Sequence, residues 1–206
     1  MNKPKLFVVA APSGGGKTSL IQALLDADEG VRLSVSYTTR PPRPGERDGV
    51  HYHFIDEDLF SELVARDAFL EYASVFDHRY GTSRETVEHQ LRQGHDVILD
   101  IDWQGARQIR ISFPACVSVF ILPPSLETLR RRLENRGQDS NEVIEKRMQR
   151  ARAEIAHWDE FDFLIVNDDF GEALADLQSI IHEGKLQRRD QEKRYVKILA
   201  DLLENG

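Results

Sequence analysis

The sequence predicts an α/β protein whose core is a parallel sheet flanked by helices. Short apolar runs of strand length alternate with amphipathic segments of helix length along most of the chain. This alternation is typical of parallel strands joined by right-handed helical crossovers. The first apolar run leads directly into a glycine-rich turn, and a more polar stretch later interrupts the alternation. We therefore expect a core that starts with a strand–turn–helix unit and carries a small α/β insertion.

The core elements follow from these runs in chain order. Each expected strand is a short, mainly apolar run, as in strands that are buried on both faces, and a helical segment follows it. The last helix, 188–204, has apolar residues at helical spacing. The strand–helix pairs are 6–11 with 17–26, 96–101 with a helix from about Gly105, 117–122 with a helix after Pro123-Pro124, and 163–166 with a helix from about Phe170.

The stretch 35–94 breaks the rhythm of the core. Its apolar runs are short, and its loop 40–49 is rich in Pro, Gly and Arg. We interpret this stretch as an α/β insertion into a core formed by residues 1–34 and 95–206. A second polar, arginine-rich segment at about 134–145 is a further candidate insertion. The elements expected within the first insertion are strands at 51–54 and 69–75 and helices at 58–66 and 84–93.

Composition and charge limit the classes of function. Of 206 residues, 40% are hydrophobic and 30% charged, as in an ordinary soluble globular protein. No apolar run approaches the ~18 residues of a membrane span. The single Cys116 excludes intrachain disulfides and cysteine-rich zinc sites and fits a reducing compartment. Because the net charge is -8, duplex nucleic acid is a poor partner. We expect a cytoplasmic protein that binds neither membrane nor nucleic acid.

The turn after the first strand carries the clearest motif. Residues 11–18 spell A-P-S-G-G-G-K-T between a strand and a helix, the context that a Walker A phosphate loop requires. Its glycines let backbone N–H groups point at phosphate oxygens, and the helix adds the positive end of its dipole. Lys17 is expected to reach the β- and γ-phosphates, and the Thr18 hydroxyl to hold Mg²⁺. The predicted triphosphate site consists of Ala11 (where the general pattern has glycine), Pro12, Ser13, Gly14, Gly15, Gly16, Lys17 and Thr18.

A loop in the insertion suits a second, smaller phosphate compound. Arg40 and Arg43 lie three apart in a proline-rich loop, and Tyr52 follows in a short strand. Forked arginine donors match phosphate geometry, and Tyr52 and Tyr80 each have a phenolic hydroxyl to donate. Four such donors suit one monophosphate. From these residues alone, a surface loop with structural tyrosines is an equal alternative, and the arginine clusters elsewhere also fit solvated helix faces.

Further short motifs follow in a fixed order along the chain. They are T-T-R-x2-R-x2-E-x2-G-x2-Y-x-F at 38–54, F-L-E-Y around Glu71, Y-G-T-S at 80–83, D-I-D-W-Q-G at 100–105 and R-x3-R-G at 132–137. Together with the phosphate loop they resemble the guanylate kinase family over essentially the whole chain. The resemblance implies a P-loop fold with a GMP-binding insertion at 35–94 and a lid at about 134–147. It implies transfer of the γ-phosphoryl group of ATP to GMP, giving ADP and GDP, with Mg²⁺ as cofactor.

The resemblance also assigns roles to individual residues. Those that match ligands of the GMP phosphate are Arg40, Arg43, Tyr52 and Tyr80. Those that match guanine contacts are Glu71 and, as auxiliary contacts, Ser36 and Thr82. Asp100 and Asp102 match acidic positions between the nucleotides, one for the water around Mg²⁺ and the other for GMP. The resemblance leaves open which is which, and the working assignment is Asp100 to Mg²⁺ through water and Asp102 to GMP. The arginines that match those closing over the triphosphate are Arg132, Arg136 and Arg147.

The implied reaction is an in-line transfer without a covalent intermediate. Its predicted catalytic residues are Lys17, Arg40, Arg136 and Arg147. One alternative is a non-catalytic interaction module of the same fold, although such modules typically lose the lysine or glycines of the phosphate loop. Another is a P-loop kinase for a different phosphorylated small molecule, which Glu71 and the arginine–tyrosine loop argue against.

The last predicted helix and Asn167 each have an interpretation that the sequence leaves open. The basic helix 188–204 fits a solvated face or a contact between subunits, so a homo-oligomer is compatible with the sequence. Asn167, directly after the last predicted strand, is a candidate for the adenine pocket. ATP and GMP are the expected small-molecule partners.

Overall fold

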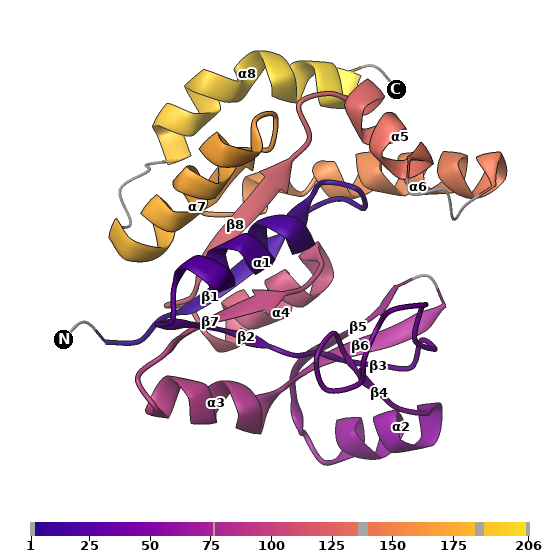
Figure 1. Ribbon diagram of the computed structural model, residues 1–206, viewed down its shortest axis with the longest axis vertical. Helices are drawn as coiled ribbons and strands as arrows, with labels where there is room; N and C mark the ends of the chain where they lie inside the picture. The colour runs from indigo at the N-terminus through magenta and orange to yellow at the C-terminus, as the bar shows by residue number, and fades with distance from the viewer. Residues whose placement is uncertain (1–2, 76, 136–139, 184–187, 205–206) are drawn as a thin grey trace. The chain divides into compact units, whose positions relative to one another are not determined.

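The computed structural model describes residues 3–75, 77–135, 140–183 and 188–204 (Figure 1). Its strands are β1 Leu6–Ala10, β2 Val31–Ser34, β3 Tyr37–Thr38, β4 His53–Phe54, β5 Phe69–Val75, β6 His78–Ser83, β7 Asp96–Asp100, β8 Val117–Leu122 and β9 Phe163–Val166. Its helices are α1 Lys17–Ala27, α2 Glu57–Ala65, α3 Arg84–Arg92, α4 Trp103–Ser112, α5 Leu126–Glu134, α6 Asn141–Ile155, the short 3-10 helix η1 Trp158–Glu160, α7 Phe170–Glu183 and α8 Arg188–Glu204.

The chain divides into two compact units. The first comprises Met1–Val8 and Asp28–Val117, and the second comprises Val9–Ala27 and Ser118–Gly206. A five-stranded sheet has the order β2-β7-β1-β8-β9, and the division falls within β1. β2 pairs with β7, and β8 pairs with β9, both in parallel. The predicted α/β class with a parallel core sheet is confirmed.

The first unit also contains a second, smaller sheet. This four-stranded sheet has the order β4-β3-β6-β5, with β6 antiparallel to both β3 and β5. The helix α2 begins at an N-cap, because the Asp56 carboxylate accepts a hydrogen bond from Leu59 N at 2.8 Å. Phe60 of α2 is fully buried and packs on Phe69 of β5, with ring centroids 4.8 Å apart. The strands of this sheet all lie within residues 35–94, the range proposed as the insertion.

The second unit is built on buried strands and a helical pair. The side chains of Phe120, Ile121 and Leu122 in β8 are almost completely buried. α5 and α6 pack through an apolar cluster of Leu129, Leu133, Ile144, Met148 and Ala151. A Cβ added at Gly14 would contact Leu129 and Leu133, so this cluster lies directly against the turn after β1. The core of the unit therefore supports the glycine-rich loop.

The expected elements are present, with differences that have local causes. The sequence analysis does not predict β2, because only Val31 and Leu33 are apolar in its four residues and no continuous apolar run marks it. It also does not predict β3, β6 or α6. The strand expected at 51–54 is limited to β4. α4 begins at Trp103 instead of about Gly105, because Asp102 caps its first turn. Among the described residues, no helix combines the length and the apolar character that a membrane crossing requires.

The cluster below the loop leads to a prediction about stability. Replacing Leu133, whose side chain is fully buried, with alanine leaves a cavity and should lower the free energy of unfolding by about 2–5 kcal/mol. Val143→Ala is the matched control on the neighbouring α6, because Val143 is 38% exposed, and it should change stability by less than about 0.5 kcal/mol. Urea denaturation measures both; equal effects would contradict the proposed packing.

Candidate active site

The loop between β1 and α1 has the backbone of a phosphate loop. Gly14 and Gly16 have φ of 89° and 90°, a region that side-chain-bearing residues rarely adopt. Gly15 N donates to Pro12 O at 2.8 Å, which closes the turn, and Leu20 N donates to Gly16 O at 3.2 Å, which starts the helix. The N-terminal N–H groups of a helix and its dipole favour an anion. The geometry therefore suits the phosphates predicted from the sequence.

Two side chains hold this loop in place from within the second unit. Ser13 N donates to Glu154 Oε2 at 3.1 Å. The amide Nδ2 of Asn167 donates to Gly15 O at 2.9 Å, and the Asn167 side chain is almost fully buried. One bond fixes a backbone donor of the loop and the other fixes a backbone acceptor, so the loop conformation is set by side chains far away in the sequence.

The predicted arginines of the triphosphate side differ in how far they are constrained. On α5, Arg132 donates from Nη2 to Asn167 O at 2.8 Å, while its Nη1 is buried and has no hydrogen-bond partner among the described residues. Burial lowers the pKa of Arg132, and the charge of Asp168 counteracts this. A buried guanidinium donor of this kind suits an anionic oxygen. Arg147 is half-buried on α6, and Arg136 lies outside the described residues.

The loop of the first unit holds Arg40 in a fixed orientation. Arg40 is only 8% exposed and forms a two-pronged ion pair with Glu46, with nitrogen–oxygen distances of 2.8 and 2.9 Å. Glu46 Oε2 also accepts from Arg43 N at 2.7 Å. Burial alone would lower the pKa of Arg40, but Glu46 and Tyr80 raise it above its ordinary value. Arg40 therefore stays charged, and the loop carries the exposed Arg43 beside it.

Two tyrosines complete this arginine cluster. The Arg40 guanidinium lies 5.4 Å from the centre of the Tyr52 ring, and the Tyr52 and Tyr80 rings are 5.9 Å apart. Burial raises the pKa of Tyr52, and the negative charge of Asp100 adds to this effect. The Tyr52 hydroxyl therefore keeps its proton and can donate a hydrogen bond. The first unit brings together Arg40, Tyr52 and Tyr80, as the sequence predicts for a monophosphate site.

Glu71 is a buried carboxylate and not an ordinary surface glutamate. It lies on β5 with 3% of its surface exposed, opposite Thr82 of β6. Thr82 Oγ1 donates to Glu71 Oε1 at 2.6 Å. A Cβ at Gly105 would overlap Glu71 Oε2, so the first turn of α4 approaches the carboxylate through a glycine. Ser36, the other predicted guanine contact, is also buried. A buried carboxylate suits ligand groups that donate hydrogen bonds.

Asp102 has a structural partner that the sequence interpretation omitted. Its Oδ1 accepts from Gly105 N at 2.9 Å, which makes it the N-cap of α4, and its Oδ2 accepts from Gln104 Nε2 at 3.1 Å. Asp100 lies half-buried at the end of β7, two residues earlier. Both carboxylates stand at the carboxyl end of a parallel strand, where α/β sheets bind ligands.

The residues predicted for Mg²⁺ have suitable chemistry. Hydroxyl and carboxylate oxygens are hard donors, and Mg²⁺ commonly keeps several waters and bonds to substrate phosphates. Thr18 is exposed in the first turn of α1, and Asp100 supplies a carboxylate in the first unit. In the part of the chain that the structure describes, no three His, Cys, Asp or Glu side chains gather as a metal cage.

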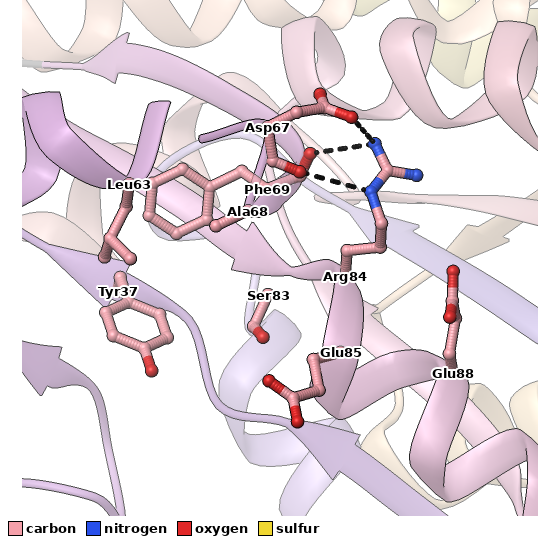
Figure 2. A pocket seen from close by; sticks show the side chains of 9 residues that line it. All are labelled: Tyr37, Leu63, Asp67, Ala68, Phe69, Ser83, Arg84, Glu85 and Glu88. Atoms are coloured by element: carbon pink, nitrogen blue, oxygen red, sulfur yellow. Dashed lines mark hydrogen bonds and ion pairs between the residues drawn. The ribbon is translucent and has the colours of Figure 1, made fainter. Parts of the chain in front are cut away.

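The first unit also contains a surface cavity away from these residues. Its volume is about 300 Å³, and Arg84 on its rim is bonded to Asp67 Oδ2 at 3.2 Å and to Phe69 O at 3.3 Å (Figure 2). None of the predicted site residues lines it. The lining residues are Tyr37, Leu63, Asp67, Ala68, Phe69, Ser83, Arg84, Glu85 and Glu88.

Comparison with known proteins decides the family. A family model described as Guanylate kinase matches residues 3–184. The chain belongs to the guanylate kinase family. It is 60% identical to the guanylate kinase of Alkalilimnicola ehrlichii over 96% of this chain and 98% of that protein. It is 57% identical to the guanylate kinase of Nitrosococcus oceani over 97% and 98% of the two chains.

A solved guanylate kinase structure supports the same assignment. The crystal structure of guanylate kinase from Anaplasma phagocytophilum aligns with a TM-score of 0.76 and 32% sequence identity. The alignment covers 95% of this chain and 97% of that chain. The resemblance to guanylate kinases found in the sequence is thus confirmed, and the protein is a kinase.

Sequence patterns missed the positioning roles of three side chains in the candidate site, Glu46, Asn167 and Glu154. Glu46 stands in the family pattern of the arginine loop, so its motif position is a signal, but its two-pronged bond to Arg40 is not visible in the sequence. Asn167 could be singled out only by its place after a strand. For Glu154, on α6, the sequence contains no signal, because its partner Ser13 lies more than a hundred residues away.

Substitutions at Asp102 can separate its role as the N-cap of α4 from its predicted contact with GMP. Asp102→Ala should lower the free energy of unfolding by about 1 kcal/mol, whereas Asp102→Asn, an equally good N-cap, should leave it nearly unchanged. If the carboxylate also serves GMP, Asp102→Asn should raise KM for GMP by about tenfold, since a charged hydrogen bond is lost. Thermal melting and steady-state kinetics give both results. If Asp102→Asn has wild-type kinetics, Asp102 is only the N-cap of α4 and its carboxylate does not contact GMP.

Proposed function

We propose that this chain transfers the γ-phosphoryl group of ATP to GMP and so returns GMP to the guanine nucleotide pool as GDP. The observation that carries the choice of acceptor is the buried pair of Glu71 and Thr82. Guanine presents N1–H and the exocyclic amino group side by side, and a carboxylate accepts from both. Ser36 is proposed as an auxiliary contact of the base.

The GMP phosphate is proposed to bind to Arg40, Arg43, Tyr52 and Tyr80. Glu46 holds the Arg40 guanidinium before any ligand arrives, so little conformational freedom is lost on binding. Arg43 follows in the same proline-rich loop, and its backbone is fixed by the same carboxylate. Asp102 is proposed to contact GMP, and residues 35–94 to form the GMP-binding subdomain.

The ATP phosphates are proposed to lie on the loop 11–18. Its backbone N–H groups and the Lys17 ammonium neutralise the negative oxygens, and Arg132 offers the buried Nη1. Arg136 and Arg147, in or beside the proposed lid at about 134–147, are assigned to the same triphosphate. Thr18 directly, and Asp100 through water, would hold Mg²⁺. When bound, Mg²⁺ supplies positive charge to the β- and γ-phosphates.

Positioning and charge neutralisation are sufficient for this reaction. A phosphate monoester has its second pKa at about 6, so the acceptor oxygen of GMP needs no strong general base at neutral pH. The proposed catalytic residues, Lys17, Arg40, Arg136 and Arg147, are all cations that can stabilise the transferring group. The transfer is in line and leaves no covalent intermediate on the protein.

The remaining partners and the location are proposals as well. The lone Cys116 suits a reducing compartment, so we propose a cytoplasmic enzyme. Its partners are proposed to be ATP and GMP, without nucleic acid or membrane, and a homo-oligomer stays compatible with α8. The intact Lys17 and the backbone of Gly14 and Gly16 favour catalysis over a non-catalytic interaction module.

An acceptor panel tests the proposal directly. ADP formation from ATP and Mg²⁺ is measured with GMP, AMP, UMP and ribose 5-phosphate, and only GMP should support rapid turnover. Lys17→Ala serves as the matched inactive control and should lower kcat by about 10³-fold, since a charge-stabilising group is lost. Rapid turnover with another acceptor, or near-normal turnover by Lys17→Ala, would contradict the proposed reaction or its phosphate loop.

Base selection leads to a second prediction, for Glu71. Glu71→Gln keeps the shape but replaces one acceptor with a donor, so GMP binding should weaken and the preference for GMP over AMP should fall by at least about tenfold. Glu62→Gln is the control, because Glu62 lies on the surface of α2 in an ion pair with Arg66. The ratio of kcat/KM for GMP and AMP is the readout. An unchanged ratio in Glu71→Gln would show that Glu71 does not select the base.

A further inference from the structure

Asn167 joins three parts of the second unit through separate hydrogen bonds. Its backbone N donates to Leu122 O at 2.8 Å, which extends the pairing of β8 and β9 by one residue. Its side-chain Nδ2 donates to Gly15 O at 2.9 Å, and its backbone O accepts from Arg132 Nη2 at 2.8 Å. The residue is 4% exposed. The sheet, the phosphate loop and α5 therefore meet at one residue.

The phosphate loop is shaped to receive this amide. A Cβ placed on Gly16 would overlap Asn167 Nδ2, so the close approach depends on glycine at that position. Gly15 O is a buried acceptor, and a buried carbonyl without a partner is unfavourable. Because the C=O and N–H of a trans peptide point in opposite directions, turning Gly15 O toward Asn167 directs the Gly16 N–H away from the amide. The amide thus selects one orientation of the loop peptides.

The backbone carbonyl of Asn167 orients the guanidinium of Arg132. Nη2 of the guanidinium is fixed by this carbonyl, and the planar group then determines the direction of Nη1. Nη1 is buried and without a partner in the part of the chain that the structure describes. Because the loop and the guanidinium are anchored on one residue at the end of a sheet strand, their donors are held in a constant relation to each other.

We propose that Asn167 is a positioning residue for the triphosphate: its side chain orients the phosphate loop and its carbonyl orients Arg132, without contact to the adenine base. This inference rests on the proposed function, since it presupposes that a triphosphate binds to the loop. It differs from a role in the adenine pocket, because a positioning residue affects any triphosphate, with or without a base.

Inorganic tripolyphosphate separates these roles, because it has the phosphates of ATP without the base. In Asn167→Ala, KM for ATP and the inhibition constant of tripolyphosphate against ATP should rise together, by about tenfold, while KM for GMP stays within about twofold. A rise in KM for ATP with unchanged tripolyphosphate inhibition would place Asn167 at the base and overturn the proposal. Unchanged values for both ligands would overturn it as well.

Two more variants test whether weaker triphosphate binding comes from the lost hydrogen bond, from altered packing or from a general loosening of the unit. Asn167→Asp has the same size but places an oxygen against Gly15 O, so it should bind both ligands at least as weakly as Asn167→Ala. Wild-type binding by a folded Asn167→Asp would overturn the proposal even if Asn167→Ala failed to fold. Thermal melting monitors folding of each variant.

Ser118→Ala is the matched control. It removes two part-buried hydrogen bonds of the same unit, from Ser118 Oγ to Asp162 Oδ2 at 2.6 Å and from Asp162 N to Ser118 Oγ at 3.0 Å. It should lower the melting temperature and leave both ligand constants unchanged. An equal loss of triphosphate binding in Ser118→Ala would mean general loosening and overturn the inference. Wild-type protein that neither uses ATP nor binds tripolyphosphate would instead refute the proposed function, and the inference with it.

Discussion

The conformation of the phosphate loop depends on backbone angles that only glycine adopts without strain. Gly14 and Gly16 both lie in the left-handed region, and between them the chain reverses to start α1. Within the loop, Gly15 N donates to Pro12 O and closes the turn. Glu154 and Asn167 supply partners from later parts of the chain, and Leu129 and Leu133 pack beneath Gly14. The donors toward phosphate are therefore fixed by the core of the second unit.

The first unit keeps charged side chains buried and ionised, so that they can still bind an anionic ligand. Arg40 is almost fully buried yet remains charged, because both carboxylate oxygens of Glu46 accept hydrogen bonds from its guanidinium. Burial acts against the ionised form of Glu46, but Arg40 and the Arg43 backbone lower the pKa of Glu46 below its usual value. Under the proposed function, this preformed pair holds the Arg40 guanidinium in one orientation before GMP arrives, which lowers the entropy cost of binding.

Part of the candidate site follows from residue types and spacing alone. The strand, the glycine run and Lys17 predict a phosphate loop because the motif is local, within eight consecutive residues. The order of the motifs in 38–54 and beyond is sufficient to indicate the family, because each motif consists of residues close together in the chain. The alternation of apolar runs likewise predicts the α/β class and most core strands, since burial on both faces requires continuous apolar residues.

Tertiary structure decides the features that depend on distant residues meeting. The sequence alone permits Glu71 to be a surface residue; its pairing with Thr82 across two strands buries it. It identifies Asp102 as an acidic residue after a strand, but only the fold shows that this carboxylate caps α4. The roles of Glu154 and Asn167 arise from hydrogen bonds that span more than a hundred residues. Local motifs determine which chemical groups are present. Long-range packing determines how each group is held, because a side chain bonds to residues that are near it in space and not only to those near it in the sequence.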